Sequence, residues 1–123
     1  MTPRKILVVD DEKNIRFMLS QTLATEDTMV ETAVNGEEAL QKLAASAYDL
    51  MLLDLRMPGM TGLEVLERVH ADHPVMPVIV LTAHGTVESA VEAMRGGAAN
   101  FLQKPFSPRE IRDAVEKALQ ERD

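Results

Sequence analysis

The chain has 123 residues, which is enough for one domain and too few for two. Its apolar content of 46% supports a single packed core, and with 3% aromatic residues that core must consist mainly of aliphatic side chains and methionine. The absence of cysteine excludes disulfides and thiolate chemistry, and the net charge of −7 disfavours nucleic-acid binding, which requires clustered basic residues.

Residues 6–9 are apolar throughout and predict a first strand. A helix is expected next, because apolar residues recur three and four positions apart from Ile15 to Leu23. Residues 29–34 predict a shorter strand near an edge of the sheet. Asn35 and Glu38 then have the spacing of a capping box at the start of a second helix.

The third strand is expected over 50–53, where every position is apolar, as in a sheet with helices on both faces. Thr61 and Glu64 predict the cap of the helix that follows. A fourth strand is expected over 75–81. The next helix should open at Gly85–Thr86 and stop at Gly96–Gly97.

A short fifth strand is expected near 99–103. Ser107, Pro108 and Glu110 form the strongest helix start in the chain, with an N-cap, a proline at the first helical position and a glutamate at the third. Five successive strand–helix units predict an α/β domain, because right-handed crossovers place helices on both faces of a parallel sheet. We expect a single domain over 1–123.

Polar side chains follow the ends of four of these strands: Asp10 and Asp11, Asp54, Thr82, and Lys104 just beyond the fifth strand. Each has a simple explanation when taken alone, such as a helix cap or a solvated lysine before a proline. The carboxyl ends of parallel strands share one edge, however, so all of these side chains should meet in one pocket. Carboxylates, a hydroxyl and an ammonium together predict a divalent-metal site with a nucleophile and an anion-binding cation.

The segments that carry these residues are 8–12, 52–62, 81–83 and 104–106, and they resemble the receiver domain of bacterial two-component response regulators. Residues 84–94 further resemble receivers of the NtrC kind. The resemblance covers essentially the whole chain. It implies a flavodoxin-like (βα)5 fold, a three-layer sandwich whose parallel strands are ordered 2-1-3-4-5.

The resemblance also implies roles for the pocket residues. Asp54 would accept a phosphoryl group. Asp11, Asp54 and the backbone carbonyl of Arg56 would bind Mg²⁺, and Asp10 would act mainly through metal-bound water. Lys104 and the Thr82 hydroxyl would contact phosphoryl oxygens.

Two further roles concern the response to phosphate. Phe101 would be the switch residue, since its ring can fill the space that Thr82 vacates when it moves inward. Arg56 and His84 lie two residues beyond Asp54 and Thr82, and we expect them to tune the lifetime of the phosphoryl group.

By this resemblance the chain is a phosphorylation-dependent signalling switch and not an enzyme beyond slow self-catalysed phosphotransfer and dephosphorylation. Its phosphoryl donor would be a sensor histidine kinase. It would form the N-terminal part of a longer regulator, with transcription the expected output, and would act in the cytoplasm, since neither a signal peptide nor a membrane span of about 20 apolar residues is evident. A homodimer through the fourth helix, fifth strand and fifth helix is expected, with charged pairs among Glu88, Glu92, Arg95, Arg109 and Arg112.

Two other functions are compatible with parts of the pattern. A small phosphohydrolase with an aspartyl-phosphate intermediate would often carry a second aspartate two residues after the first, where this chain has Arg56. A flavodoxin-like cofactor binder is disfavoured because no glycine-rich loop follows the first strand.

Overall fold

The strands and helices alternate along the chain, as expected. In the computed structural model, which describes residues 3–83 and 85–122, one parallel sheet has the strand order β2-β1-β3-β4-β5. Its strands are β1 (Arg4–Val9), β2 (Thr28–Ala33), β3 (Leu50–Asp54), β4 (Val78–Thr82) and β5 (Asn100–Gln103). The helices are α1 (Lys13–Leu23), α2 (Gly36–Ala45), α3 (Gly62–Asp72), α4 (Val87–Arg95) and α5 (Pro108–Glu121).

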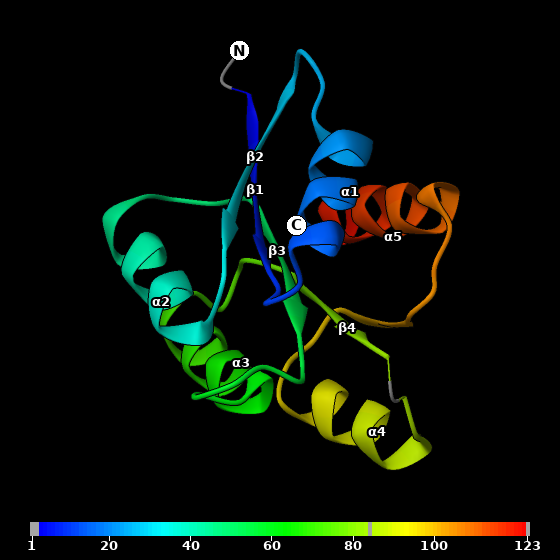
Figure 1. Ribbon diagram of the computed structural model, residues 1–123. Helices are drawn as coiled ribbons and strands as arrows, with labels where there is room; N and C mark the ends of the chain where they lie inside the picture. Colours follow the sequence, from blue (N-terminus) through cyan, green and yellow to red (C-terminus); the bar gives the residue numbers. More distant parts are fainter. Residues whose placement is uncertain (1–2, 84, 123) are drawn as a thin grey trace.

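The sheet lies between two layers of helices, so the predicted three-layer sandwich is confirmed (Figure 1). Helices α1 and α5 cover one face, and α2, α3 and α4 cover the other. Successive side chains of β3 point to opposite faces: Leu50 and Leu52 pack with α1 and α5, while Met51 and Leu53 pack with α2 and α3. This double burial is the reason that β3 is apolar over its whole length before Asp54.

Most helix starts follow the sequence signals. Complete capping boxes join Thr61 to Glu64 and Ser107 to Glu110. The expected box at Asn35 is only half formed: its side chain accepts from the Glu38 amide, but the Glu38 carboxylate accepts from the Val34 amide instead. Glu38 therefore also satisfies a backbone donor just beyond the end of β2.

The fourth strand begins later than the sequence predicts. It starts at Val78 and not at 75, and the Val75 side chain is 70% exposed. Pro74 and Pro77 account for the difference, because proline has no amide hydrogen to donate to a neighbouring strand. No helix in the described part of the chain is long and apolar enough to cross a membrane.

Gly62, the first residue of α3, lies directly beneath the end of β3. Its amide donates to the Leu55 carbonyl at 3.1 Å. A Cβ at this position would lie 2.5 Å from the Asp54 carbonyl oxygen and 2.5 Å from the Leu55 Cα. Helix α3 can therefore approach the strand that ends at Asp54 because residue 62 has no side chain.

We expect Gly62→Ala to destabilise the protein by about 1–3 kcal/mol, because the added methyl group meets backbone that cannot move aside. Gly36→Ala is the matched control: it also alters the first residue of a helix, but its Cβ meets the side chain of Val65. Denaturant unfolding of both variants measures the effect. A loss at Gly62 no larger than that at Gly36 would contradict this account of the packing.

Candidate functional site

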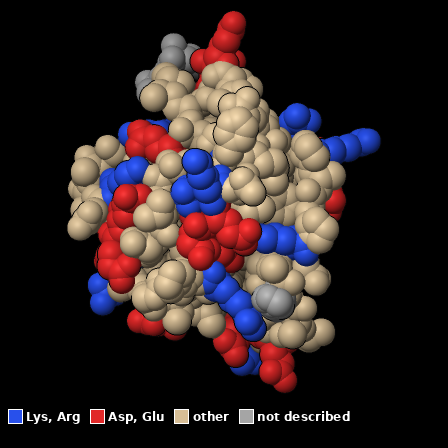
Figure 2. Space-filling view, viewed as in Figure 1, with Lys and Arg blue, Asp and Glu red and all other residues tan. Residues whose placement is uncertain are grey.

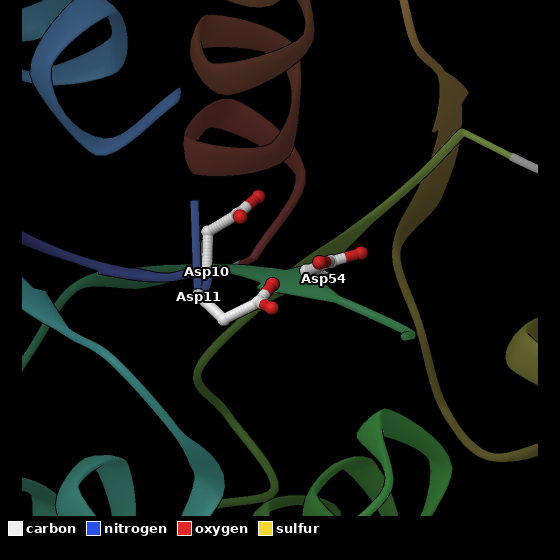
Figure 3. Close-up of side chains that lie close together, drawn as sticks. All are labelled: Asp10, Asp11 and Asp54. Atoms are coloured by element: carbon white, nitrogen blue, oxygen red, sulfur yellow. The ribbon is translucent and has the colours of Figure 1, made fainter. Parts of the chain in front are cut away.

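The carboxyl edge of the sheet brings together side chains from the ends of four strands. Asp10 follows β1, Asp54 and Thr82 end β3 and β4, and Lys104 follows β5. Carboxylate oxygens of Asp10, Asp11 and Asp54 all lie within 4.8 Å of one another, and Figure 3 shows the Asp10 and Asp11 side chains leaving the chain in different directions beside Asp54. The sequence therefore predicted correctly that the three carboxylates and Lys104 lie together, and Thr82 is placed at the end of the neighbouring strand.

Asp10 is fully buried, and each of its carboxylate oxygens has a partner. One oxygen accepts from the Glu12 amide at 2.9 Å, and the other accepts from Lys104 Nζ at 2.9 Å. Its own amide donates to the Ala33 carbonyl at 3.2 Å and so continues the β1–β2 ladder. A buried charge needs this degree of pairing, since an unpaired one would cost several kcal/mol.

Lys104 is the cation of the pocket. Besides Asp10, its Nζ lies 3.5 Å from Glu12 and 3.8 Å from Asp54. Burial lowers the pKa of Lys104, but the hydrogen bond and the charge of Asp10, with Asp54 and Glu12, outweigh burial and raise it above its usual range. The ammonium is therefore charged at neutral pH.

Asp54 differs from Asp10 in having fewer partners. It is 3% exposed, and one carboxylate oxygen accepts from the Arg56 amide at a long 3.3 Å. Burial first, and the charge of Asp10 second, raise the pKa of Asp54 to about 6, although Lys104 opposes the shift. A carboxylate that is poorly compensated and lies next to other carboxylates is a strong candidate to meet a cation or to react.

The switch candidates lie on β4 and β5. Thr82 is 1% exposed, and its carbonyl accepts from the Lys104 amide at 2.7 Å, which ties the ends of the two strands together. Phe101 is half-buried, and its ring lies beside Gly85, where a Cβ would be 3.2 Å from the Phe101 Cε1. Arg56 is exposed on the loop after Asp54, and His84 lies outside the described residues.

Two charged residues of the site were missed by the sequence reasoning. Glu12 supplies both an amide to Asp10 and a carboxylate near Lys104. Arg16, on the first turns of α1, donates from Nη1 to the Asp10 carbonyl at 2.9 Å. The run Asp10–Asp11–Glu12 gave a signal for Glu12, whereas Arg16 looks like any charged residue of an amphipathic helix.

The surface around the pocket mixes both charges. Figure 2 shows acidic side chains gathered near the middle of this view, with basic side chains around them. In the pocket itself the donors from Asp10, Asp11 and Asp54 are carboxylate oxygens, which are the ligands that Mg²⁺ prefers. Asp11 is exposed at the edge of the group and leaves room for solvent. The residues present therefore fit a hard divalent cation that keeps several waters.

The raised pKa of Asp54 predicts a pH-dependent stability. The folded state binds the proton of the Asp54 carboxyl more tightly than the unfolded state does. The resulting contribution to the free energy of unfolding is fully present below the ordinary pKa of 3.8 and is lost as the pH rises through about 6. In the metal-free protein, Asp54→Asn should therefore gain about 1–3 kcal/mol at pH 7 and almost nothing near pH 3. Thermal unfolding across this range, with the exposed Asp72→Asn as control, measures it. Equal stability of parent and Asp54→Asn at pH 7 would contradict the assignment.

Known proteins resemble this chain over nearly all of its described length. Residues 6–116 match the family described as response regulator receiver domain. The DNA-binding transcriptional regulator NtrC of Escherichia coli K12 is 42% identical over 114 residues, which is 93% of this chain and 24% of that regulator. The chain thus spans about a quarter of the length of this relative.

Solved structures agree with the sequence comparison. A response regulator receiver domain protein described as CheY-like, from Methanospirillum hungatei JF-1, has a TM-score of 0.94 at 32% identity and covers 98% of this chain and 97% of its own. The receiver domain of NtrX from Brucella abortus has a TM-score of 0.89 at 36% identity, and the match covers 94% of this chain and 98% of that domain. With the strand order 2-1-3-4-5 and the acidic pocket at its carboxyl edge, the chain belongs to the response regulator receiver domain family.

Proposed function

We propose that this domain is a phosphorylation-dependent switch in which Asp54 takes a phosphoryl group from a sensor histidine kinase, with Mg²⁺ bound beside it. The observation that carries the proposal is the position of Asp54: a nearly buried carboxylate at the end of the central strand, within 4.8 Å of the Asp10 and Asp11 carboxylates and 3.8 Å from Lys104. Membership of the receiver family supports it.

In this proposal a carboxylate oxygen of Asp54 attacks phosphorus while the bond between phosphorus and the donor breaks, which gives an acyl phosphate. Asp11, Asp54 and the Arg56 carbonyl would hold Mg²⁺, which supplies positive charge against the repulsion between carboxylate and phosphate. Asp10 keeps Lys104 in the pocket. The 3.8 Å gap between Lys104 and Asp54 is short enough for the ammonium to reach a phosphoryl oxygen attached there.

The response to phosphate would begin at Thr82. Its hydroxyl would donate to a phosphoryl oxygen, and Phe101 would then rotate into the vacated space. Two contacts support a coupled movement: the Lys104 amide bonds to the Thr82 carbonyl, and the Phe101 ring lies against Gly85, two residues before α4. A phosphoryl group adds about −1.5 to −2 charge, so the pull on these neighbours is substantial.

The role in the whole protein is proposed from the longer relatives. NtrC is a DNA-binding transcriptional regulator of which this domain spans 24%. We propose that residues 1–123 form the N-terminal receiver of a comparable cytoplasmic regulator and make no direct contact with nucleic acid or membrane. The alternative of a small phosphohydrolase lacks support in the pocket, because position 56 carries an exposed arginine and not an acid–base carboxylate.

Asp54→Asn should abolish phosphorylation. With Mg²⁺ and acetyl phosphate, intact mass spectrometry of the parent should show a single phosphoryl adduct, and the variant should show none, because an amide cannot form the acyl phosphate. Asp72→Asn is again the control. Undiminished labelling of Asp54→Asn at another carboxylate would contradict the assignment, and free phosphate without any adduct on the parent would favour the phosphohydrolase.

Arg56 and His84 are proposed to set the lifetime of the acyl phosphate, because each lies two residues beyond a pocket residue. Substituting either with alanine should change the rate of dephosphorylation more than the yield of phosphorylation. The decay of the purified phosphoprotein, followed by intact mass, gives that rate. Equal decay across several substitutions at both positions would end this proposal.

We propose that phosphorylation is read out through a homodimer formed by α4, β5 and α5. Helix α4 exposes Val87, Val91 and Met94, with exposed fractions of 81%, 41% and 49%, and Val91 and Met94 form part of an open, largely apolar surface. Exposed apolar side chains gathered on one helix favour a protein contact. Arg112 does not belong to this face, because it lines a groove with Thr22 and Leu23 of α1. We therefore no longer expect Arg112 to take part in the charged pairs of the dimer.

Beryllofluoride, which mimics the phosphoryl group, should increase dimer formation in sedimentation and X-ray scattering. Val91→Asp should weaken the dimer, because a charge would be buried in the contact. Met29→Asp is the matched control, since Met29 is 51% exposed and lies on β2, at the edge of the sheet opposite β5. Identical mass and shape with and without the mimic would exclude self-association as the output.

A further inference from the structure

The peptide group between Asp10 and Asp11 lies where β1 ends. The Asp10 amide still pairs with the Ala33 carbonyl of β2 at 3.2 Å. The Asp10 carbonyl has left the ladder, and its partner is a side chain: Arg16 Nη1 donates to it at 2.9 Å. A hydrogen bond from a charged donor is about twice as strong as a neutral one, so this contact holds the orientation of the peptide plane firmly.

Arg16 closes this turn at two points. Its backbone amide donates to the Glu12 carbonyl at 3.1 Å, and its guanidinium reaches back to Asp10. Asp11 lies between Asp10 and Glu12, the two residues whose carbonyls accept these hydrogen bonds. The side chain of Arg16 is half-buried, so the guanidinium is less free to exchange its partner for water than a fully exposed one would be.

Asp10 and Asp11 are fixed in different ways. The Asp10 carboxylate is held by the Glu12 amide and by Lys104. Within residues 3–83 and 85–122, the Asp11 carboxylate has no hydrogen bond or ion pair, although it belongs to the group of three carboxylates. The position of Asp11 is therefore set by the backbone that carries it, and that backbone begins at the peptide group that Arg16 holds.

We propose that Arg16 is a positioning residue that orients the Asp10–Asp11 peptide and so presents the Asp11 carboxylate to the cation. The inference rests on the proposed function, because it assigns Arg16 a part in the same metal site. Arg16 is not proposed as a ligand of the metal or of the phosphoryl group. It acts through the backbone, from the helix that follows the acidic loop.

A positioning role and a simple charge effect of Arg16 would change the affinity for Mg²⁺ in opposite directions, so one measurement separates them. Arg16 is positive and lies near a cation site, so removing its charge without any other change should strengthen Mg²⁺ binding. Losing the orientation of Asp11 should weaken binding, and groups that orient metal ligands typically contribute about 10–100-fold in affinity. A weaker affinity after loss of a positive charge is therefore diagnostic of positioning.

The test compares Arg16→Met with Lys13→Met in the full chain. Lys13 is exposed on the same first turns of α1, and its loss removes the same charge without the bond to Asp10. Calorimetric titration with Mg²⁺ alone should show Kd raised about 10-fold by Arg16→Met and unchanged or lowered by Lys13→Met. Arg16→Lys, which keeps a charged donor, should recover part of the affinity.

A second measurement keeps the result independent of folding defects. The NMR amide signal of Asp11 should shift in metal-free Arg16→Met, while the signals of β3 stay in place. If Arg16→Met does not fold, Arg16→Gln is measured in its place. Equal Kd values for Arg16→Met and Lys13→Met would overturn the positioning role. Failure of the parent to bind Mg²⁺ would instead overturn the proposed function, so the two failures are distinguishable.

Discussion

The organisation of this domain depends on the repulsion between carboxylates that the sheet brings together at its carboxyl edge. Asp10 and Asp54 are both buried, and Asp11 lies beside them. Two unit charges 4 Å apart interact by roughly 4 kcal/mol at an effective dielectric of 20. Lys104 offsets part of this energy through its ion pair with Asp10. Burial and the charge of Asp10 still raise the pKa of Asp54 to about 6, because Lys104 lies further from Asp54 and opposes the shift only in part.

The packing of the sheet makes such a concentration of charge possible. Side chains of β3 and β4 are buried on both faces between two helical layers, so apolar burial supplies stability that the charged edge lowers. Natural domains often accept local destabilisation where they carry out chemistry. In the metal-free state the carboxylates repel one another, and a bound cation would reduce this repulsion. The repulsion therefore favours the binding of a cation at the site.

Contacts from the pocket to the surface run mostly through backbone. Gly62 places α3 against the Asp54 carbonyl, and the Lys104 amide ties the end of β5 to Thr82. The Phe101 ring contacts Gly85, two residues before α4. A change in charge at Asp54 thus has short physical connections to two helices, and α4 is the one that presents apolar side chains to solvent.

The strands, most helix starts and the location of the pocket could be predicted from the sequence alone. Apolar runs gave the strands, capping residues such as Thr61 and Ser107 gave helix starts, and polar residues at strand ends gave the pocket, because these signals are local and a parallel sheet collects its strand ends at one edge. The tertiary structure decided three other features: the pairing of Lys104 with Asp10, the late start of β4, and the contact of Arg16 with the Asp10 carbonyl. Each depends on side-chain reach and burial between segments distant in sequence or across a turn, which periodicity and composition do not encode.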